Sequence, residues 1–153
     1  MAKTKPVSLE GVRIGFRNFE GREGKYNREG DRSFAVFLDM ETAQMLAADG
    51  WNVKFPKPNP GRVDPDEPER DAFIQVAVGF DAYPANVFLI TDDKSTRIGE
   101  DEIKMLDWAE IENVDLVIRP YEWAVSGNTG IKAYLKSGYF SIIVDKFASK
   151  YGL

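Results

Sequence analysis

The 153-residue sequence contains no cysteine and no histidine. Without cysteine the chain has no disulfide, no thiolate nucleophile and no thiolate metal ligand. Without histidine it lacks the usual general base near pH 7 and the commonest zinc ligand. Mechanisms that rely on Ser-His-Asp or Cys-His groups are therefore excluded, and an enzyme would have to use carboxylates, Lys, Tyr or Ser.

Long apolar runs are also absent. No stretch reaches the ~18 consecutive apolar residues that a membrane span needs. The N-terminal "MAKTKPVSLEGVRIG" has no apolar core of a signal peptide. Apolar residues nonetheless make up 43% of the chain and aromatic residues 12%, which is typical of a globular protein. We therefore expect one folded domain over residues 1–153, in a soluble intracellular protein with no membrane partner.

The net charge of −5 is unevenly distributed along the chain. Residues 1–38 hold eight Lys or Arg against five Asp or Glu, whereas the remaining 115 residues hold twelve against twenty. An acidic protein can carry a local basic surface, and the local surface determines whether a polyanion binds. Such an asymmetry also arises by chance. The negative net charge of the whole chain nevertheless does not exclude a nucleic-acid partner.

Most of the chain alternates apolar and polar residues, which predicts strands. In the first strand Val12, Ile14 and Phe16 would face the core, opposite a basic face. The strands that we expect to form the core of the fold span residues 7–19, 33–39, 72–80, 113–126 and 130–144.

Two helices are expected between the strands. The apolar spacing in "GEDEIKMLDWAE" predicts a helix over residues 100–110. A shorter helix, "METAQMLAAD", would begin after Asp39 and end at Gly50, because these residue types favour the two ends of a helix.

Three strands, a helix and two strands follow one another in the order of an OB-fold, a five-stranded Greek-key barrel. The predicted fold class is therefore mainly β with short helices (α+β): an OB-fold-like barrel with inserted elements and a long C-terminal hairpin around "SGNTG". A jelly roll or another β-sandwich is the alternative. Segments 40–70 and 82–98 would be elaborations. Within the first, residues 56–71 hold five of the eight prolines and five acids, which predicts a surface insertion.

The stretch from Gly15 to Phe34, "GFRNFEGREGKYNREGDRSF", mixes basic, acidic, aromatic and glycine residues between two predicted strands. In an OB-fold, residues 20–32 would connect the first two strands and "SGNTG" the last two, and these two connections hold oligonucleotides. Cations here would contact phosphates, and a tyrosine would stack on a base. The candidates are Arg17, Arg22, Lys25, Tyr26, Arg28 and Arg32. In the alternative interpretation, these cations pair with the acids Glu20, Glu23, Glu29 and Asp31.

The hairpin supplies the second half of the candidate site. Its outer face would carry Arg119, Tyr121, Trp123, Lys132, Tyr134 and Lys136, if Leu116 and Ile118 point inward. A turn at residues 128–129 would set Trp123 opposite Tyr134 and Tyr121 opposite Lys136. Val125 would then lie opposite Lys132. Rings and cations of this kind hold single-stranded nucleic acid without reading its sequence. Alternatively, the Trp–Tyr pair only stabilises the sheet.

Four blocks of the sequence carry a family resemblance: "FRNFEGREGKYNREGDRSFAVFL", "DGWNVK", "NVDLVIRPYEW" and "GNTGIKAYLKSGYF". From residue 9 to residue 147 the chain resembles bacteriophage proteins that bind single-stranded DNA in replication. The resemblance implies an OB-fold, no catalytic residue and a strand-coating role in phage DNA replication or recombination. The matched blocks contain Arg17, Tyr26, Arg119, Tyr121, Trp123, Lys132 and Tyr134.

The resemblance also sets the expected partners. Single-stranded DNA is the main one, in the cytoplasm of the bacterial host, while replication or recombination proteins and a second copy of the chain stay open. Many proteins of this kind end in an acidic tail that recruits partners. This chain ends in "VDKFASKYGL", which is not acidic. Either such regulation is absent, or the sequence is shortened, or the acidic stretch 64–71 has a comparable role.

Two rival functions fit parts of the sequence. A β-rich phage protein could be a virion or assembly component with no nucleic-acid role. Asp66, Glu102 and Lys104 outline a metal-dependent nuclease motif, but a proline-rich loop and a helix do not bring acids together on a strand core. "GREGK" lacks the spacing of a phosphate-binding loop, and "DPDE" lacks that of a calcium loop. We therefore expect no enzyme, no cofactor and no metal.

Overall fold

The computed structural model describes residues 5–25, 27–55, 72–81, 83–92 and 94–143. These residues form a mainly β protein with one α-helix and one short 3₁₀ helix, which confirms the predicted class. The elements are β1 (Val7–Leu9), β2 (Arg13–Asn18), β3 (Arg32–Leu38), α1 (Met40–Ala48), β4 (Val53–Lys54), β5 (Ala72–Val78), β6 (Asn86–Thr91), β7 (Lys94–Ile98), η1 (Ile103–Asp107), β8 (Ile111–Val125) and β9 (Asn128–Ile142). Tyr26, the 56–71 insertion and the C-terminal residues 144–153 lie outside the described residues.

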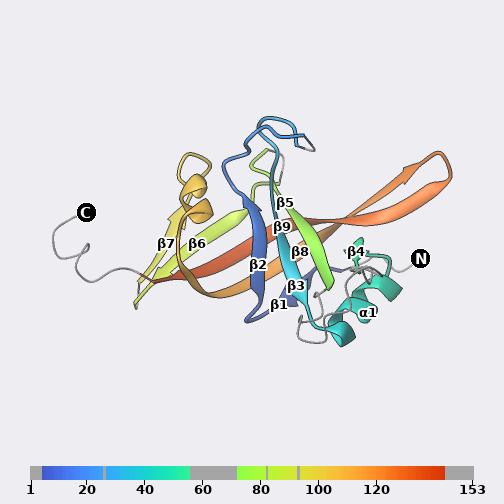
Figure 1. Cartoon of the computed structure of the whole chain (residues 1–153), viewed down its shortest axis with the longest axis horizontal. Helices are drawn as coiled ribbons and strands as arrows, with labels where there is room; N and C mark the ends of the chain where they lie inside the picture. Colours follow the sequence, from blue (N-terminus) through green and yellow to red (C-terminus); the bar gives the residue numbers. More distant parts are fainter. Residues whose placement is uncertain (1–4, 26, 56–71, 82, 93, 144–153) are drawn as a thin grey trace, which may run out of the picture.

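All nine strands belong to one mixed sheet (Figure 1). Its main path runs β1-β8-β9-β5-β3-β2, with β4 on β5 and with β6 pairing both β7 and β9. The β5–β9 and β6–β9 pairs are parallel, and the other pairs are antiparallel. The N-terminal segment lies at both ends of the path, because β1 pairs with β8 while β2 pairs with β3. The closed five-stranded barrel stays a prediction.

The first predicted strand, 7–19, is divided into β1 and β2 and carries a correction. Gly11, at a φ of 60°, lies between the two strands, and the register between β2 and β3 shifts between Gly15 and Asn18. Val12 and Ile14 pack against the core as predicted, but Phe16 does not. Its φ is 47° and 75% of its surface is exposed, because the irregularity turns its side chain to the opposite face of the strand.

The core lies on the inner face of the sheet and contains a group of three phenylalanines. The rings of Phe19 and Phe34 stack at 5.0 Å, and Phe140 meets both of them edge-on. All three are buried, as are Val36 and Leu38 of β3. Complete burial of each such side chain contributes about 1.5–3 kcal/mol to folding.

Helix α1 has the ends that the sequence predicted. The Asp39 carboxylate accepts a hydrogen bond of 2.7 Å from the backbone N–H of Thr42. Gly50, at a φ of 99°, donates its N–H to the Ala47 carbonyl just after the helix. The other predicted helix, over 100–110, is shortened to the 3₁₀ helix η1, whose Ile103 and Leu106 are buried as expected. Strand β7 was not predicted from the sequence, because "KSTRI" is exposed at every position except Ile98 and so shows no apolar alternation. None of the described helices is long and apolar enough to cross a bilayer.

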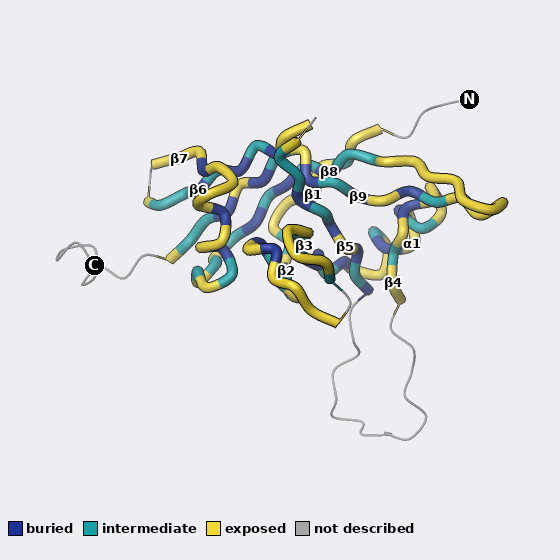
Figure 2. The backbone as a smooth tube through the Cα atoms, turned by 90° about the horizontal axis from the view of Figure 1, so that it is seen from above, coloured by how far each residue is buried: buried dark blue, intermediate teal, exposed yellow. Residues whose placement is uncertain are grey.

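The long hairpin of β8 and β9 is present, but its turn lies two residues earlier than predicted. Val125 pairs with Asn128, so the turn is Ser126-Gly127 instead of Asn128-Thr129. Both turn residues have positive φ, 51° and 84°, as a tight type I′-like turn requires, and glycine adopts this conformation at little cost. The hairpin end projects from the rest of the molecule in Figure 1 and is exposed in Figure 2.

Candidate nucleic-acid interface

The outer face of the hairpin carries the predicted aromatic and basic side chains. Leu116 and Ile118 are buried in the core, so the alternate residues of β8 point outward. Of these, Tyr121 and Trp123 are exposed and Arg119 is half-buried. Because successive side chains of a strand point to opposite faces, the burial of Leu116 and Ile118 places the alternate side chains on the outer face.

The pairing across the hairpin differs from the prediction. Arg119 pairs with Tyr134, Tyr121 with Lys132, and Trp123 with Gly130. The predicted pairs of Trp123 with Tyr134, Tyr121 with Lys136 and Val125 with Lys132 are wrong, because the turn begins two residues earlier. The partner of Trp123 moves by an even number of residues along β9, so every side chain keeps its predicted face.

Tyr134 is the centre of the group. The guanidinium carbon of Arg119 lies 4.8 Å from the Tyr134 ring centre, and the Lys132 Nζ atom lies 5.1 Å from it. The Tyr121 ring meets the same ring edge-on at 5.8 Å. Attraction between cations and the face of the ring holds positive charge beside an aromatic surface.

Tyr83 is a residue of this site that the sequence analysis missed. The Arg119 guanidinium carbon is 4.9 Å from its ring centre, and 71% of the Tyr83 surface is exposed. Tyr83 lies in the connection between β5 and β6, far from the hairpin in sequence. An aromatic residue beside Pro84 in a polar connection was the only available signal. We call Tyr83, Arg119, Tyr121, Trp123, Lys132 and Tyr134 the hairpin cluster.

The Trp123 ring packs closely against the opposite strand because its partner there is a glycine. A Cβ atom on Gly130 would lie 2.7 Å from the Trp123 ring. The missing side chain lets the indole approach the backbone, and 36% of the residue's surface remains exposed. The indole is therefore held against the sheet while part of it stays accessible to a base.

A groove of about 600 Å³ joins the hairpin cluster to the basic loop. The loop contributes Asn27 and the segment 30–32, and the strands between contribute Ser33, Gln75 and Ala77. The hairpin contributes Trp123, Lys132 and Tyr134. The loop and the hairpin are far apart in sequence but line the same groove.

Two of the loop arginines, Arg17 and Arg32, donate side-chain hydrogen bonds within the protein. Arg17 donates from Nη1 to the carbonyls of Leu106 and Ala109, at 3.0 and 2.7 Å, and so holds the end of η1. Arg32 lines the groove, but its Nη1 atom is 3.2 Å from a Glu100 carboxylate oxygen and only 19% of its side chain is exposed.

The remaining candidates lie at the surface. Arg22 is exposed, with its Nε atom 3.9 Å from a Glu20 oxygen and its guanidinium carbon 5.8 Å from the Trp108 ring centre. Lys25, Arg28 and Lys136 are exposed. Tyr26 lies outside the described residues.

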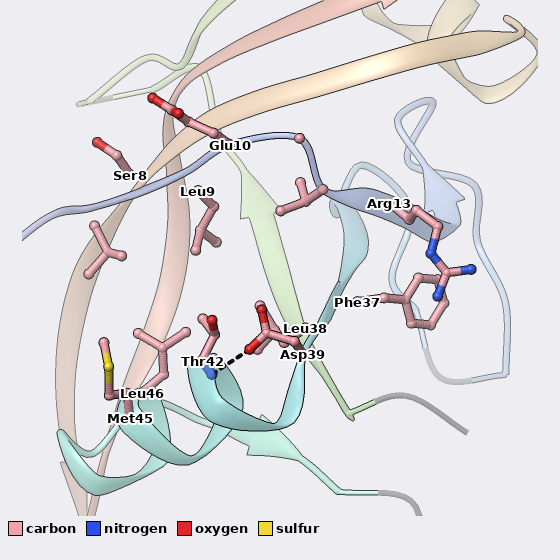
Figure 3. A pocket seen from close by; sticks show the side chains of 13 residues that line it. Ser8, Leu9, Glu10, Arg13, Phe37, Leu38, Asp39, Thr42, Met45 and Leu46 are labelled. Carbon is pink, nitrogen blue, oxygen red and sulfur yellow. Dashed lines mark hydrogen bonds between the residues drawn. The ribbon is translucent and has the colours of Figure 1, made fainter. Parts of the chain in front are cut away.

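A second hollow, of about 540 Å³, lies between β1 and α1 (Figure 3). Glu10 and Asp39 are among the residues that line it, with Arg13 at one end. The described residues contain no cluster of three acidic side chains that could hold a metal ion. Glu102, at the start of η1, and Lys104 are exposed, whereas Asp66 of the nuclease motif lies outside the described residues.

A β-sheet groove that combines aromatic faces with cations is typical of proteins that hold single-stranded nucleic acid. The sequence family described as "Putative phage ssDNA-binding domain" matches residues 1–153, and the chain belongs to this family. The family is one of DNA-binding domains and not of enzymes. No curated protein sequence matches the chain.

Solved structures share the fold. The single-stranded DNA-binding protein from bacteriophage Enc34 matches over 100% of this chain and 97% of its own, with a TM-score of 0.55 and 15% identity. The same phage protein in complex with ssDNA matches over 94% of this chain and 89% of its own, with a TM-score of 0.56 and 16% identity. Its C-terminal truncation matches over 92% and 87%, also with a TM-score of 0.56 and 16% identity.

Proposed function

We propose that the protein binds single-stranded DNA without sequence preference and protects it during phage DNA replication or recombination, in the cytoplasm of the bacterial host. The observation that carries the proposal is the position of Tyr134, which has two cations and a second ring around it at the edge of the groove. Bases stack on the exposed rings, and Lys132 and Arg119 contact the phosphates between them. Single-stranded DNA is the partner; association with replication or recombination proteins, or with a second copy, would build on this site.

The chemistry of the cluster accounts for sequence tolerance. Each base has a π-face, so stacking on Trp123 or Tyr121 does not depend on which base is present. Each stacked base is worth about 1–3 kcal/mol, and each phosphate contact releases a counterion, which makes the affinity depend on salt.

We also propose that the main strands form an OB-type barrel within a single domain, residues 1–153. The support is the order of strand pairing, with β1 and β2 counted together as one first strand. Its β2 part pairs with β3, and β5, β9 and β8 follow in that order. β8 in turn pairs with the β1 part of the first strand. In such a barrel the loop 20–32 connects the first two strands and the turn at 126–127 connects the last two. The 600 Å³ groove lies between the loop and the hairpin cluster, where OB-folds bind oligonucleotides.

Intrinsic tryptophan fluorescence tests the proposal directly. Trp51 is buried, whereas Trp108 and Trp123 are exposed, so only the latter two can respond to a ligand by direct contact. Titration with oligo-dT should quench the emission, and the quench should weaken as salt is raised. Trp123→Phe should lose most of the quench but keep most of the affinity, because a ring remains. Trp123→Ala should weaken binding roughly 5-fold or more.

Trp108→Phe is the matched control, since it removes an exposed indole outside the groove and should leave most of the quench. Duplex DNA of equal length should compete weakly. An unchanged affinity in Trp123→Ala would contradict the proposed site. The absence of any response at low salt would contradict the function and favour the virion or assembly component.

A further inference from the structure

Phe16 is exposed at a strained position of β2 and is not part of the hydrophobic core. Three-quarters of its surface, 75%, is exposed, and its φ of 47° is rare for a residue with a bulky side chain. Backbone strain of this kind persists where the surrounding structure enforces it, and it is concentrated at functional sites. The strain turns the ring away from the core side of β2, where Val12 and Ile14 pack.

Two further rings surround Phe16 on the outer side of the sheet. Its ring centre is 5.8 Å from that of Phe73 on β5 and 6.2 Å from that of Phe37 on β3. Phe37 and Phe73 are directly paired across their strands, with ring centres 6.4 Å apart. We call these three residues the phenylalanine cluster.

A glycine and an arginine complete the arrangement. A Cβ atom on Gly15 would lie 2.7 Å from the Phe37 ring, so the glycine lets that ring lie over β2. The guanidinium carbon of Arg13 is 5.5 Å from the Phe37 ring centre, and the two side chains lie together in Figure 3. An exposed cation against an aromatic face is the same combination that the hairpin cluster contains.

The phenylalanine cluster and the hairpin cluster lie on the same face of the sheet. Ala77 on β5 pairs with Tyr134, and Phe73 points to the same side four positions earlier on β5. At ~3.3 Å per residue, the two sites are separated by about 13 Å along the strand. Ser33 and Gln75 lie between them, joined by a hydrogen bond of 3.1 Å, and both line the groove.

We propose that the phenylalanine cluster, with Arg13, is a second base-stacking site, and that one DNA strand crosses the sheet from the hairpin cluster to Phe16. This inference rests on the proposed function and extends it. A span of about 13 Å corresponds to about four stacked nucleotides at ~3.4 Å each. The phenylalanine cluster is continuous with the groove and carries the positive charge of Arg13. Both features favour single-stranded DNA as the occupant over an apolar surface of a second copy of the chain.

The test compares oligonucleotides of two lengths. Oligo-dT of about two nucleotides is shorter than the span of about 13 Å and can fill only one site, whereas about twelve nucleotides can reach both. Phe16→Leu keeps an apolar side chain but removes the ring. It should weaken binding of the longer oligonucleotide about 5-fold and leave the shorter one, held by the hairpin cluster, within about twofold. Phe73→Leu should behave in the same way, and ultraviolet cross-linking should attach thymine to residues of the phenylalanine cluster.

Phe88→Leu is the matched control, because Phe88 stacks on Tyr139 at 5.2 Å and lines no part of the groove. It should leave binding of both lengths unchanged. The second site is overturned if wild type and Phe16→Leu bind both lengths equally while Trp123→Ala is impaired, and the proposed function then stands. A change in self-association alone, measured by light scattering, would also overturn it. If the wild type binds neither length, it is the proposed function that fails.

Discussion

Two glycines of the sheet each support an aromatic ring from the neighbouring strand. A Cβ atom would lie 2.7 Å from Trp123 if placed on Gly130, and 2.7 Å from Phe37 if placed on Gly15. In both places the absence of one methyl-sized group lets an aromatic ring approach the backbone of the neighbouring strand closely. Each glycine thus makes room for an aromatic side chain, and an aromatic ring that covers a glycine is known to stabilise that position in a sheet.

At the same scale, Asp39 makes the stability of α1 depend on pH. Hydrogen bonds from the backbone and the side chain of Thr42 lower the pKa of the Asp39 carboxyl group below its usual 3.8. Because the folded pKa is lowered, the stabilisation is fully present above the unfolded pKa and is lost as pH falls through the folded value. We expect Asp39→Ala to lower the melting temperature at pH 7, and the difference from wild type to shrink at pH values below 3.8.

The control for this prediction is Asp39→Asn. Asparagine is also a good first residue for a helix but cannot ionise, so it should retain most of the stability at pH 7. Thermal unfolding followed by circular dichroism measures all three proteins across the acid range. An Asp39→Ala deficit that stays constant from neutral to acid pH would contradict the assigned charge dependence.

Among the elements, η1 owes its position to two side chains at its C-terminal end. Arg17 on β2 donates to the carbonyls of Leu106 and Ala109, and Asp107 accepts the N–H groups of Phe19 and Glu20 at 2.7 and 3.0 Å. Hydrogen bonds to charged groups contribute about 1.5–3 kcal/mol each. The short helix is thereby joined to the strand that leads into the basic loop.

Arg17 was predicted as a DNA contact, and its hydrogen bonds support a different outcome for its removal. Arg17→Ala should lower the free energy of unfolding by about 1.5–3 kcal/mol in urea denaturation, because two carbonyls lose their donor. Under conditions where the variant is folded, its affinity for oligo-dT should be close to that of wild type. Arg28→Ala, an exposed change in the same basic region, should not affect stability. A stable Arg17→Ala protein with weakened binding would instead make this arginine a DNA contact.

Elements with one buried face were predictable from the sequence, and those set by turn geometry were not. The alternation of Phe34, Val36 and Leu38 identifies β3 because burial imposes the period of two. The hairpin register depended on which two residues adopt positive φ, and "SGNTG" offers more than one pair. Phe16 was assigned to the core because periodicity cannot reveal a local irregularity in the strand. Tyr83 enters the site only through the fold, since no local pattern connects it to Arg119.

At the scale of the whole molecule, the net charge of −5 and the cations of the hairpin cluster act over different distances. The net charge acts at a distance, where salt screens it within a Debye length of about 8 Å at physiological ionic strength. Contacts within the groove are short, so they are screened less. If DNA binds as proposed, the acidic remainder of the protein would disfavour weak binding of polyanions elsewhere on the surface and would restrict DNA to the face that carries Lys132 and Arg119.

Salt dependence separates phosphate contacts from stacking. For a single strand, the logarithm of affinity falls with the logarithm of salt concentration by about 0.7 for each phosphate that is neutralised. We expect Lys132→Gln to reduce this slope by about 0.7, because one cation leaves the groove. Trp123→Ala should lower the affinity at every salt concentration without changing the slope, since a stacked base releases no counterion. Lys94→Gln, an exposed lysine on β7, should change neither quantity. Equal slopes for wild type and Lys132→Gln would mean that Lys132 does not contact a phosphate, and the hairpin cluster would then hold DNA by its rings and Arg119 alone.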